Sequence, residues 1–133
     1  MKRVLVELDQ DNRAFWTGGA TGRLLINRCG NCALYLHPPI PRCPHCGSRD
    51  VAPTAVSGRG RVHSFTLNHR AWEPGLDVPY VVALVEIAEQ EGVLLPTNIV
   101  QCAPEDVAIG MEVEVVFEQV EDLFVPLFRP VAP

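Results

Sequence analysis

Two Cys-x-x-Cys pairs lie close together in the first half of the chain and constrain its fold more than any other feature. The first pair is Cys29 and Cys32, and the second, after a spacer of ten residues, is Cys43 and Cys46. A thiolate pair binds one side of a tetrahedral ion, and a second pair completes the site at Zn–S distances of about 2.3 Å. Because four cysteines leave no open coordination position, the spacing predicts a structural zinc ribbon.

The residues around the cysteines favour this metal site over its alternatives. Each pair lies in a predicted turn, and Gly47 after the second pair allows a tight backbone. The spacer contains three prolines, which favour a short extended loop over a helix. The alternatives are a redox Cys-x-x-Cys, which does not need two matched pairs, and iron in a rubredoxin-like centre. His37 and His45 are then expected to be loop residues and not ligands.

The length and composition of the chain limit the class of protein. With 133 residues, 47% of them hydrophobic, it can bury a core of its own. It is too long for a disulfide mini-protein and shows no signal-peptide pattern, so we expect a cytoplasmic protein with reduced thiols. No stretch approaches the roughly 18 consecutive apolar residues of a membrane span. We therefore expect no membrane association.

Charge is divided unevenly between the two halves of the chain. Residues 1–62 contain nine basic and four acidic residues, a net charge of +5, whereas residues 63–133 contain two basic and twelve acidic residues, a net charge of −10. Nucleic-acid binders rely on a basic surface that displaces counterions from the phosphates. The acidic C-terminal half therefore argues against binding of DNA or RNA.

The segment before the cysteine pairs predicts a short helix that carries two aromatic residues. Asp9 or Asp11 can cap this helix, and Phe15 and Trp16 follow. Three glycines within residues 18–22 weaken it, because each costs roughly 1 kcal/mol against Ala in a helix interior. Phe15 and Trp16 either pack on the protein's own core or contact a partner subunit, since aromatic residues often anchor interfaces.

After Gly58 the sequence changes to short apolar segments separated by turn signals. The predicted strands cover residues 61–69, 79–87, 93–100, 112–118 and 124–128. The first alternates like a half-buried strand, whereas the second is an apolar run typical of a strand covered on both faces. Pro96 is expected at a bulge or an edge, and residues 104–110 have room for one helical turn. Five strands with a helical turn before the fourth match a small OB-fold barrel, and a sandwich stays open.

Together these motifs resemble a known family. The similarity is carried by the Phe-Trp pair and by GRLLINRCGNC, CPHCGS, VSGRGRVHSFTLNHR, PYVVALVEI, TNIVQCAPEDVAIGMEVEVVFE and PLFRP. Over roughly residues 12–130 the chain is similar to the zinc-ribbon plus OB-fold proteins that accompany thiolases and acyl-CoA aldolases. The resemblance implies a mainly β protein with an N-terminal helical segment (1–23), a rubredoxin-like zinc ribbon (24–57) and a five-stranded OB-fold barrel (58–133). It also implies that the structural zinc is held by Cys29, Cys32, Cys43 and Cys46.

The resemblance further implies a function. Members of this family are generally non-catalytic partners of a thiolase-like subunit, including steroid side-chain-cleaving aldolases whose partner resembles a lipid-transfer thiolase. We therefore predict an accessory subunit that is not an enzyme on its own and helps form its partner's acyl-CoA site for carbon–carbon bond cleavage or formation. A heterotetramer with two copies of each subunit is expected. Phe15 and Trp16 are candidate partner contacts, and Arg59 and Arg61 are candidate contacts for CoA phosphates.

Two functions of other classes stay open from the sequence alone. OB folds and zinc ribbons also bind single-stranded nucleic acid, which requires a basic groove with stacking aromatic residues. A stand-alone acyl-CoA enzyme or thioesterase requires a nucleophile with a positioned base. The candidates are Cys102, His63 and His69, which show no recognisable dyad spacing. Salt-sensitive oligonucleotide binding, or turnover by the chain alone, would identify these functions.

Overall fold

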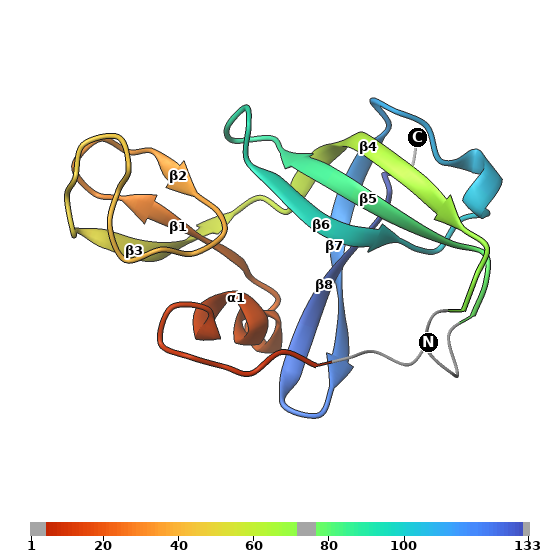
Figure 1. Cartoon of the computed structure of the whole chain (residues 1–133), viewed down its shortest axis with the longest axis horizontal. Coiled ribbons are helices and arrows are strands. Elements are labelled where there is room, and N and C mark those ends of the chain that lie inside the picture. Colours follow the sequence, from red (N-terminus) through yellow and green to blue (C-terminus); the bar gives the residue numbers. More distant parts are fainter. Residues whose placement is uncertain (1–4, 72–76, 132–133) are drawn as a thin grey trace.

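The computed structural model describes residues 5–71 and 77–131 of the chain. It contains a small three-stranded sheet and a closed five-stranded barrel, with a short N-terminal helix that contacts strands of both (Figure 1). No helix within the described residues is long and apolar enough to cross a membrane. The predicted fold class, mainly β with a short helix, a zinc ribbon and an OB-fold barrel, is confirmed.

The small sheet connects the cysteine turns to the rest of the molecule. Its central strand β1 (Leu24–Cys29) pairs along its whole length with β3 (Val51–Val56), and its far end pairs with β2 (Tyr35–Leu36). Ile26 of β1 is buried in the main apolar core, whereas Cys29 at the end of the same strand is buried in a second core around the cysteines. Strand β1 therefore runs from the main core to the metal site.

The barrel closes in the order β4–β5–β6–β8–β7. Its strands are β4 (Arg59–Asn68), β5 (Tyr80–Ile87), β6 (Leu94–Ile99), β7 (Glu112–Val120) and β8 (Leu123–Pro130). A 3-10 turn, η2 (Pro104–Asp106), precedes β7. It lies within residues 104–110, where the sequence predicted one helical turn. Neighbouring strands are antiparallel except β6 and β8, whose parallel contact is the single pair Ile99 and Phe128. The sandwich alternative is therefore wrong.

Strand β6 is nearly an edge strand, and this explains the proline within it. Pro96 pairs with Leu84 of β5, but the opposite side of β6 meets β8 only at its last residue. Proline is tolerated at such an edge, where few ladder hydrogen bonds are required. The edge expected at Pro96 is confirmed, and a register shift typical of a bulge occurs instead in β4, between Val62 and Ser64.

Strand β5 departs from its sequence-based prediction. Its residues alternate along the strand, so that Val81, Ala83, Val85 and Ile87 are buried, whereas Val82 is 37% exposed. The barrel covers only the inner face of this strand. The prediction that residues 79–87 are covered on both faces is therefore wrong for this chain by itself.

The N-terminal segment forms α1 (Arg13–Thr17) and then a 3-10 turn, η1 (Gly18–Thr21). The Oδ1 atom of Asp9 accepts hydrogen bonds from the backbone N–H groups of Asp11 and Asn12, each at 2.8 Å. Asp9 therefore orders the turn before α1, but the N-cap of the helix is Asn12, which makes no side-chain capping hydrogen bond. The prediction that Asp9 or Asp11 caps the helix is wrong.

The glycines that follow α1 allow a close approach to the barrel. A Cβ atom at Gly19 would lie 2.5 Å from side-chain atoms of Phe117 and Phe124, on the β7–β8 hairpin. Such a separation is far below van der Waals contact, so only glycine fits there. The glycines that weaken the helix therefore also let the segment pack against the hairpin.

The hairpin loop between β5 and β6 holds the small sheet against the barrel. The side-chain amide of Gln90 accepts a hydrogen bond from the backbone N–H of Tyr35 at 2.9 Å and donates one to its carbonyl at 3.1 Å. One amide thus satisfies both backbone groups of a β2 residue, as a neighbouring strand would. In the connection to the barrel, Glu89 accepts a hydrogen bond from the backbone N–H of Ser57 at 2.6 Å.

Candidate metal centre

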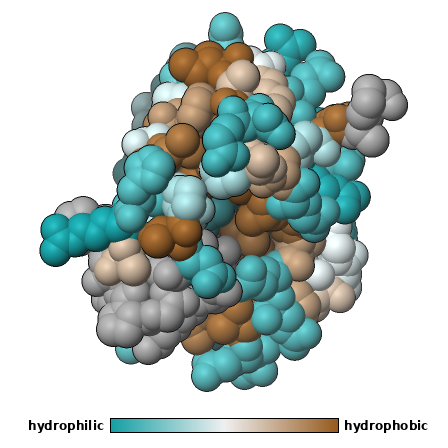
Figure 2. Space-filling view, turned by 90° about the vertical axis from the view of Figure 1, so that its right-hand side faces the viewer, coloured by the Kyte–Doolittle hydropathy of each residue, from teal (hydrophilic) through white to brown (hydrophobic). Residues whose placement is uncertain are grey.

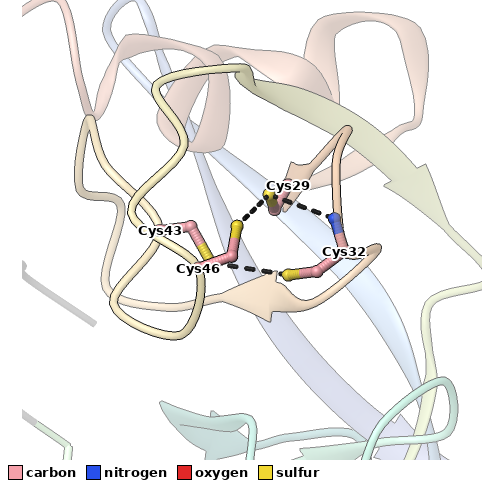
Figure 3. Close-up of side chains that lie close together, drawn as sticks. All are labelled: Cys29, Cys32, Cys43 and Cys46. Atoms are coloured by element: carbon pink, nitrogen blue, oxygen red, sulfur yellow. Dashed lines mark hydrogen bonds between the residues drawn. The ribbon is translucent and has the colours of Figure 1, made fainter.

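Four cysteine thiols converge at the far end of the small sheet (Figure 3). Cys29 is the last residue of β1 and Cys32 lies on the turn that follows it, whereas Cys43 and Cys46 lie on the loop between β2 and β3. All four Sγ atoms lie within 4.8 Å of one another. The Cys29–Cys46 and Cys32–Cys43 sulfur atoms are each 3.6 Å apart.

These distances fit one tetrahedral ion. A Zn–S bond of about 2.3 Å in tetrahedral geometry places sulfur atoms about 3.8 Å apart, close to the observed 3.6 Å. Two of the sulfur separations therefore match those of a zinc site, and the others stay within 4.8 Å. With four protein ligands no coordination position is left for a substrate, so the role of the ion is structural.

The two cysteine turns share one backbone pattern. The N–H groups of Ala33 and Gly47 donate to the carbonyls of Cys29 and Cys43, each at 2.9 Å. Ala33 and Gly47 both adopt left-handed backbone, with φ of 66° and 77°. The expected tight turn at Gly47 is confirmed, and Ala33 adopts the same conformation at a cost of about 1 kcal/mol.

An arginine precedes the first cysteine of each pair and makes the same contact in both turns. Nε of Arg28 donates to the carbonyl of Ala33 at 3.2 Å, and Nε of Arg42 donates to that of Gly47 at 2.8 Å. Four thiolates around Zn²⁺ have a net charge of −2, which two nearby guanidinium groups partly offset. This role of the two arginines was not predicted from the sequence. The signal in the sequence is the Arg-Cys dipeptide, which occurs in both pairs.

The pKa values of two thiols are shifted by the groups packed around them. A backbone hydrogen bond from Leu34 lowers the pKa of Cys32, but desolvation and hydrogen bonds with the other thiols outweigh it and raise that pKa to about 12. A side-chain hydrogen bond from Asn31 and a backbone one from Ser48 lower the pKa of Cys46 to about 6. Neighbouring thiolates penalise one another's charge, and a bound dication compensates for it.

The aromatic pair of α1 lies at the junction with the ribbon. Phe15 is 8% exposed, and its ring centroid lies 5.0 Å from that of Trp16 and 4.9 Å from that of His37. Trp16 is half-buried against the main core. Phe15 therefore packs on the protein's own core. A contact of this pair with a partner subunit stays a prediction.

His37, in the spacer between the cysteine pairs, is more than the loop residue that the sequence suggested. Its Nδ1 atom is buried and has no hydrogen-bond partner among the residues that the structure describes. Desolvation lowers the pKa of the imidazole to about 4, so the ring is neutral at physiological pH. Together with Phe15 it joins the ribbon to the N-terminal helix.

Arg59 and Arg61 lie at one end of the barrel, beside a depression of about 420 Å³ that Glu86 and Glu112 also line. Nη2 of Arg61 is 3.4 Å from Oε1 of Glu112, and Nε of Arg59 is 3.9 Å from Oε2 of Glu114. These carboxylates partly balance the two arginine charges, and a CoA phosphate would have to displace them. The contact of these arginines with CoA stays a prediction.

The candidates for a nucleophile and a base are not brought together. Cys102 lies after β6, and desolvation, followed by the charge of Asp106, raises its pKa. The thiol form therefore prevails at neutral pH, and a thiol is a weak nucleophile. Within residues 5–71 and 77–131, neither His63 nor His69 forms a hydrogen bond with this thiol.

Two family models match consecutive parts of the chain. The ChsH2 rubredoxin-like zinc ribbon domain matches residues 16–52, and the ChsH2 C-terminal OB-fold domain matches residues 53–118. The ribbon match and the four convergent thiols confirm the predicted structural zinc. Zinc is therefore preferred over the redox alternative for the Cys-x-x-Cys pairs.

Two solved structures are similar to this one. A chain titled Ltp2-ChsH2(DUF35) aldolase superposes with a TM-score of 0.83 at 42% identity, covering 96% of this chain and 100% of that chain. A DUF35-family protein of unknown function from Sulfolobus solfataricus has a TM-score of 0.63 at 18% identity, covering 92% of this chain and 86% of that one. The second match shows the fold alone.

Curated relatives fall into two groups of different length. A probable enoyl-CoA hydratase alpha subunit from Thermomonospora curvata is 43% identical over 95% of this chain, which spans only 39% of that relative. A 3-oxo-4,17-pregnadiene-20-carboxyl-CoA hydratase alpha subunit from Mycobacterium tuberculosis is 35% identical over 91% of this chain and 38% of the relative. A DUF35 domain-containing scaffold protein from Methanothermobacter thermautotrophicus is 35% identical over 72% of each chain.

Proposed function

The chain belongs to the DUF35 family, whose members join a ChsH2-type zinc ribbon to an OB fold, and on this premise we propose that it is a non-catalytic accessory subunit. In this proposal it binds a thiolase-like or aldolase partner and helps form that partner's acyl-CoA site for carbon–carbon bond cleavage or formation. The observation that carries the proposal is the structural match to a chain of the Ltp2-ChsH2(DUF35) aldolase, which covers the whole length of that chain. The name of this aldolase contains two components, Ltp2 and ChsH2(DUF35).

The architecture of the chain supports a role as a docking platform. The zinc fixes the two cysteine turns, β1 connects them to the main core, and Gln90 ties β2 to the barrel. Because these contacts already order the surface, a partner that binds it has little conformational entropy to remove. Such an ordered surface can position a substrate for groups that the partner supplies.

The names of the relatives support acyl-CoA as the substrate class. Two are hydratase alpha subunits, and one of these is named for a steroid thioester, 3-oxo-4,17-pregnadiene-20-carboxyl-CoA. We propose that the partner contributes the nucleophile or base and most of the acyl-chain pocket. Steroid side-chain degradation is then one setting for the complex, with two copies of each subunit as the simplest symmetric assembly.

Affinity purification from native cells tests this proposal. The tagged chain is expected to recover a thiolase-like subunit in equimolar amount, and the complex is expected to cleave or form a β-hydroxyacyl-CoA. The chain alone is expected to show no turnover with the same thioester. Turnover by the lone chain, or recovery of no thiolase-like protein, would overturn the proposal. A Cys43→Ser variant is expected to lose the partner, whereas the matched Cys102→Ser variant keeps it.

The composition of two barrel strands argues against the nucleic-acid alternative. The second and third strands of an OB barrel usually form its oligonucleotide-binding face, and here these strands, β5 and β6, contain no lysine or arginine. Binding to phosphates requires basic residues on that face. Fluorescence anisotropy with a labelled oligothymidylate is expected to show no salt-sensitive association, and such an association would favour this alternative.

A further inference from the structure

The outer surface of three barrel strands forms a distinct face. The pairing register places Ser64, Leu84 and Pro96 in one row across β4, β5 and β6, and Thr66, Val82 and Asn98 in the next row. Because the alternate residues of β5 are buried inside the barrel, these two rows point outward. We refer to these six residues as the outer face.

The composition of β5 does not match its surroundings in the isolated chain. The run Tyr80–Ile87 is apolar except for Glu86, a pattern typical of strands buried on both sides. The barrel covers only one side, and it leaves Val82 37% exposed and Leu84 partly exposed. The sequence of this strand therefore fits a state in which something also covers the outer face.

Charge distinguishes the outer face from the opposite wall of the barrel. None of its six residues is charged, whereas strand β7 includes Glu112, Glu114 and Glu118. Removing charged groups from water is expensive, whereas removing uncharged polar groups costs less and removing apolar groups is favourable. The outer face is therefore the wall of the barrel that a partner can dehydrate most easily.

The amide groups on and beside this face already have partners within the chain. Nδ2 of Asn98 donates to the carbonyl of Val81 at 2.8 Å, and Nδ2 of Asn68 donates to the hydroxyl of Tyr80 at 2.7 Å. A polar group loses stability on burial chiefly when its hydrogen bonds are not replaced. These bonds survive when another surface covers the face, so covering these two amides costs little.

The shape of the outer face identifies the kind of occupant. Five of its residues, all except Asn98, line a shallow depression of about 280 Å³. Small-molecule sites are usually enclosed clefts of about 300–1,000 Å³, so the depression suits a single protruding side chain of a protein. A second copy whose two-fold axis passed through the depression would place the same depression opposite and leave a void.

Within residues 5–71 and 77–131, the other large exposed apolar residues come from separate segments of the chain. Figure 2 shows separate apolar patches between hydrophilic residues at the barrel end that faces the viewer. Ile109, in the turn before β7, is 72% exposed. Apolar residues scattered singly over a surface are normal and indicate no partner. Ile109 therefore serves as a control for the outer face.

We propose that the outer face docks an uncharged, apolar patch of the thiolase-like partner subunit. A protruding apolar side chain of the partner sits in the depression beside Val82, Leu84 and Pro96, and the acidic β7 wall stays in water. This inference rests on the proposed function, because it assigns the surface through which the accessory subunit binds its partner.

Arginine substitutions on and off the face test the assignment. The probe is the thiolase-like subunit recovered with the tagged wild-type chain, and its dissociation constant is measured by biolayer interferometry. Val82→Arg and Thr66→Arg are each expected to weaken binding at least tenfold. Ile109→Arg, a matched change at a more exposed apolar residue, is expected to alter binding less than twofold. Val82→Thr, which keeps the shape without charge, is expected to bind almost as the wild type.

The outcomes separate this inference from the proposed function. If the wild type binds the subunit and both face variants bind equally well, the outer face is overturned and the function stands. If no thiolase-like subunit is recovered, both are overturned. Sedimentation of the lone chain adds a third outcome, because a dimer that Val82→Arg dissociates would assign the face to a second copy and overturn the inference. If Val82→Arg misfolds by circular dichroism, Thr66→Arg decides the result.

Discussion

The ribbon and the barrel are stabilised in different ways. Among the residues that the structure describes, the second core, around the metal site, buries Cys29, Leu36 and Cys43, so two of its three buried residues are metal ligands. The barrel buries a continuous set of aliphatic and aromatic side chains, among them Val85 and Phe128. The metal therefore replaces a hydrophobic core in the ribbon, whereas apolar burial is sufficient in the barrel.

The two regions nevertheless share one strand. Strand β1 contributes Leu24 and Ile26 to the main core and Cys29 to the metal site. We expect the metal end of the ribbon to depend on zinc and its other end to depend on the barrel. The division of the chain at residues 23 and 57 stays a prediction, because this shared strand makes the ribbon only partly independent.

Loss of a zinc ligand should give the largest difference between the regions. Cys43→Ser is expected to remove most of the metal-binding free energy, which is about 10 kcal/mol or more for structural zinc sites. Elemental analysis should then show less than one zinc per chain. Hydrogen exchange should become fast over residues 29–51 and remain slow in β4–β8.

Cys102→Ser is the matched control, since it removes the cysteine that lies outside the metal site. This variant should retain one zinc per chain and the exchange pattern of the wild type. Normal zinc content in Cys43→Ser would contradict the metal assignment. Rapid exchange throughout the barrel of that variant would instead show that the barrel also depends on the metal.

The converse change removes a barrel side chain. Phe128 is 1% exposed in the main core, so Phe128→Ala is expected to lower the free energy of unfolding by about 3–5 kcal/mol. The native variant should still contain one zinc. Urea denaturation followed by circular dichroism measures the change, and Val82→Ala, at an exposed site of the same barrel, should cost far less. Equal costs at the two sites would contradict the assigned core.

The contact between the regions is the next test. Gln90→Ala removes both hydrogen bonds to the backbone of Tyr35, and we expect a loss of about 1–2 kcal/mol. The amide of Tyr35 should exchange faster while zinc content stays unchanged. Gln90→Glu keeps the acceptor for the Tyr35 N–H but loses the donor, so its effect should be intermediate. Unchanged exchange at Tyr35 in Gln90→Ala would show that other contacts hold the two regions together.

Local patterns in the sequence were sufficient to predict the metal site and the strands of the barrel. The cysteine spacing identified the four ligands, and alternation in residues 61–69 indicated a half-buried strand, whose Phe65 and Leu67 pack against the core. The strands of the ribbon were not predicted. The first includes the apolar run Leu24–Ile26, but β3 (Val51–Val56) contains a proline and only short side chains.

Contacts between distant segments were beyond sequence reasoning. The pairing of Gln90 with Tyr35 joins residues 55 positions apart, and nothing in the local pattern of either residue indicates it. The acidic partners of Arg59 and Arg61 come from β7, which only the barrel register brings beside β4. Which face of β5 is exposed to solvent also depends on contacts between distant segments. The sequence of β5 therefore indicated burial on both faces and did not identify the exposed one.

The smallest expected effect concerns a residue of the ribbon that packs on an aromatic side chain. Burial against Phe15 lowers the pKa of His37 from 6.5 to about 4. The unfolded chain therefore binds a proton at His37 more readily than the folded chain does. The stability that neutral His37 provides is complete above pH 6.5 and is lost as the pH falls from 6.5 towards 4. We expect a loss of about 1 kcal/mol by about pH 5.5.

A His37→Gln variant isolates this effect from the other groups that titrate in the same range. Protonation of the zinc thiolates and of the remaining histidines affects both proteins alike, so the difference between them reports on His37. Urea denaturation should show that the free energy of unfolding falls more steeply between pH 7.5 and 5.5 in the wild type than in the variant. Parallel pH profiles would mean that protonated His37 finds water or a carboxylate in the folded state. The ribbon spacer would then be less tightly packed on Phe15 than the barrel core is on Phe128.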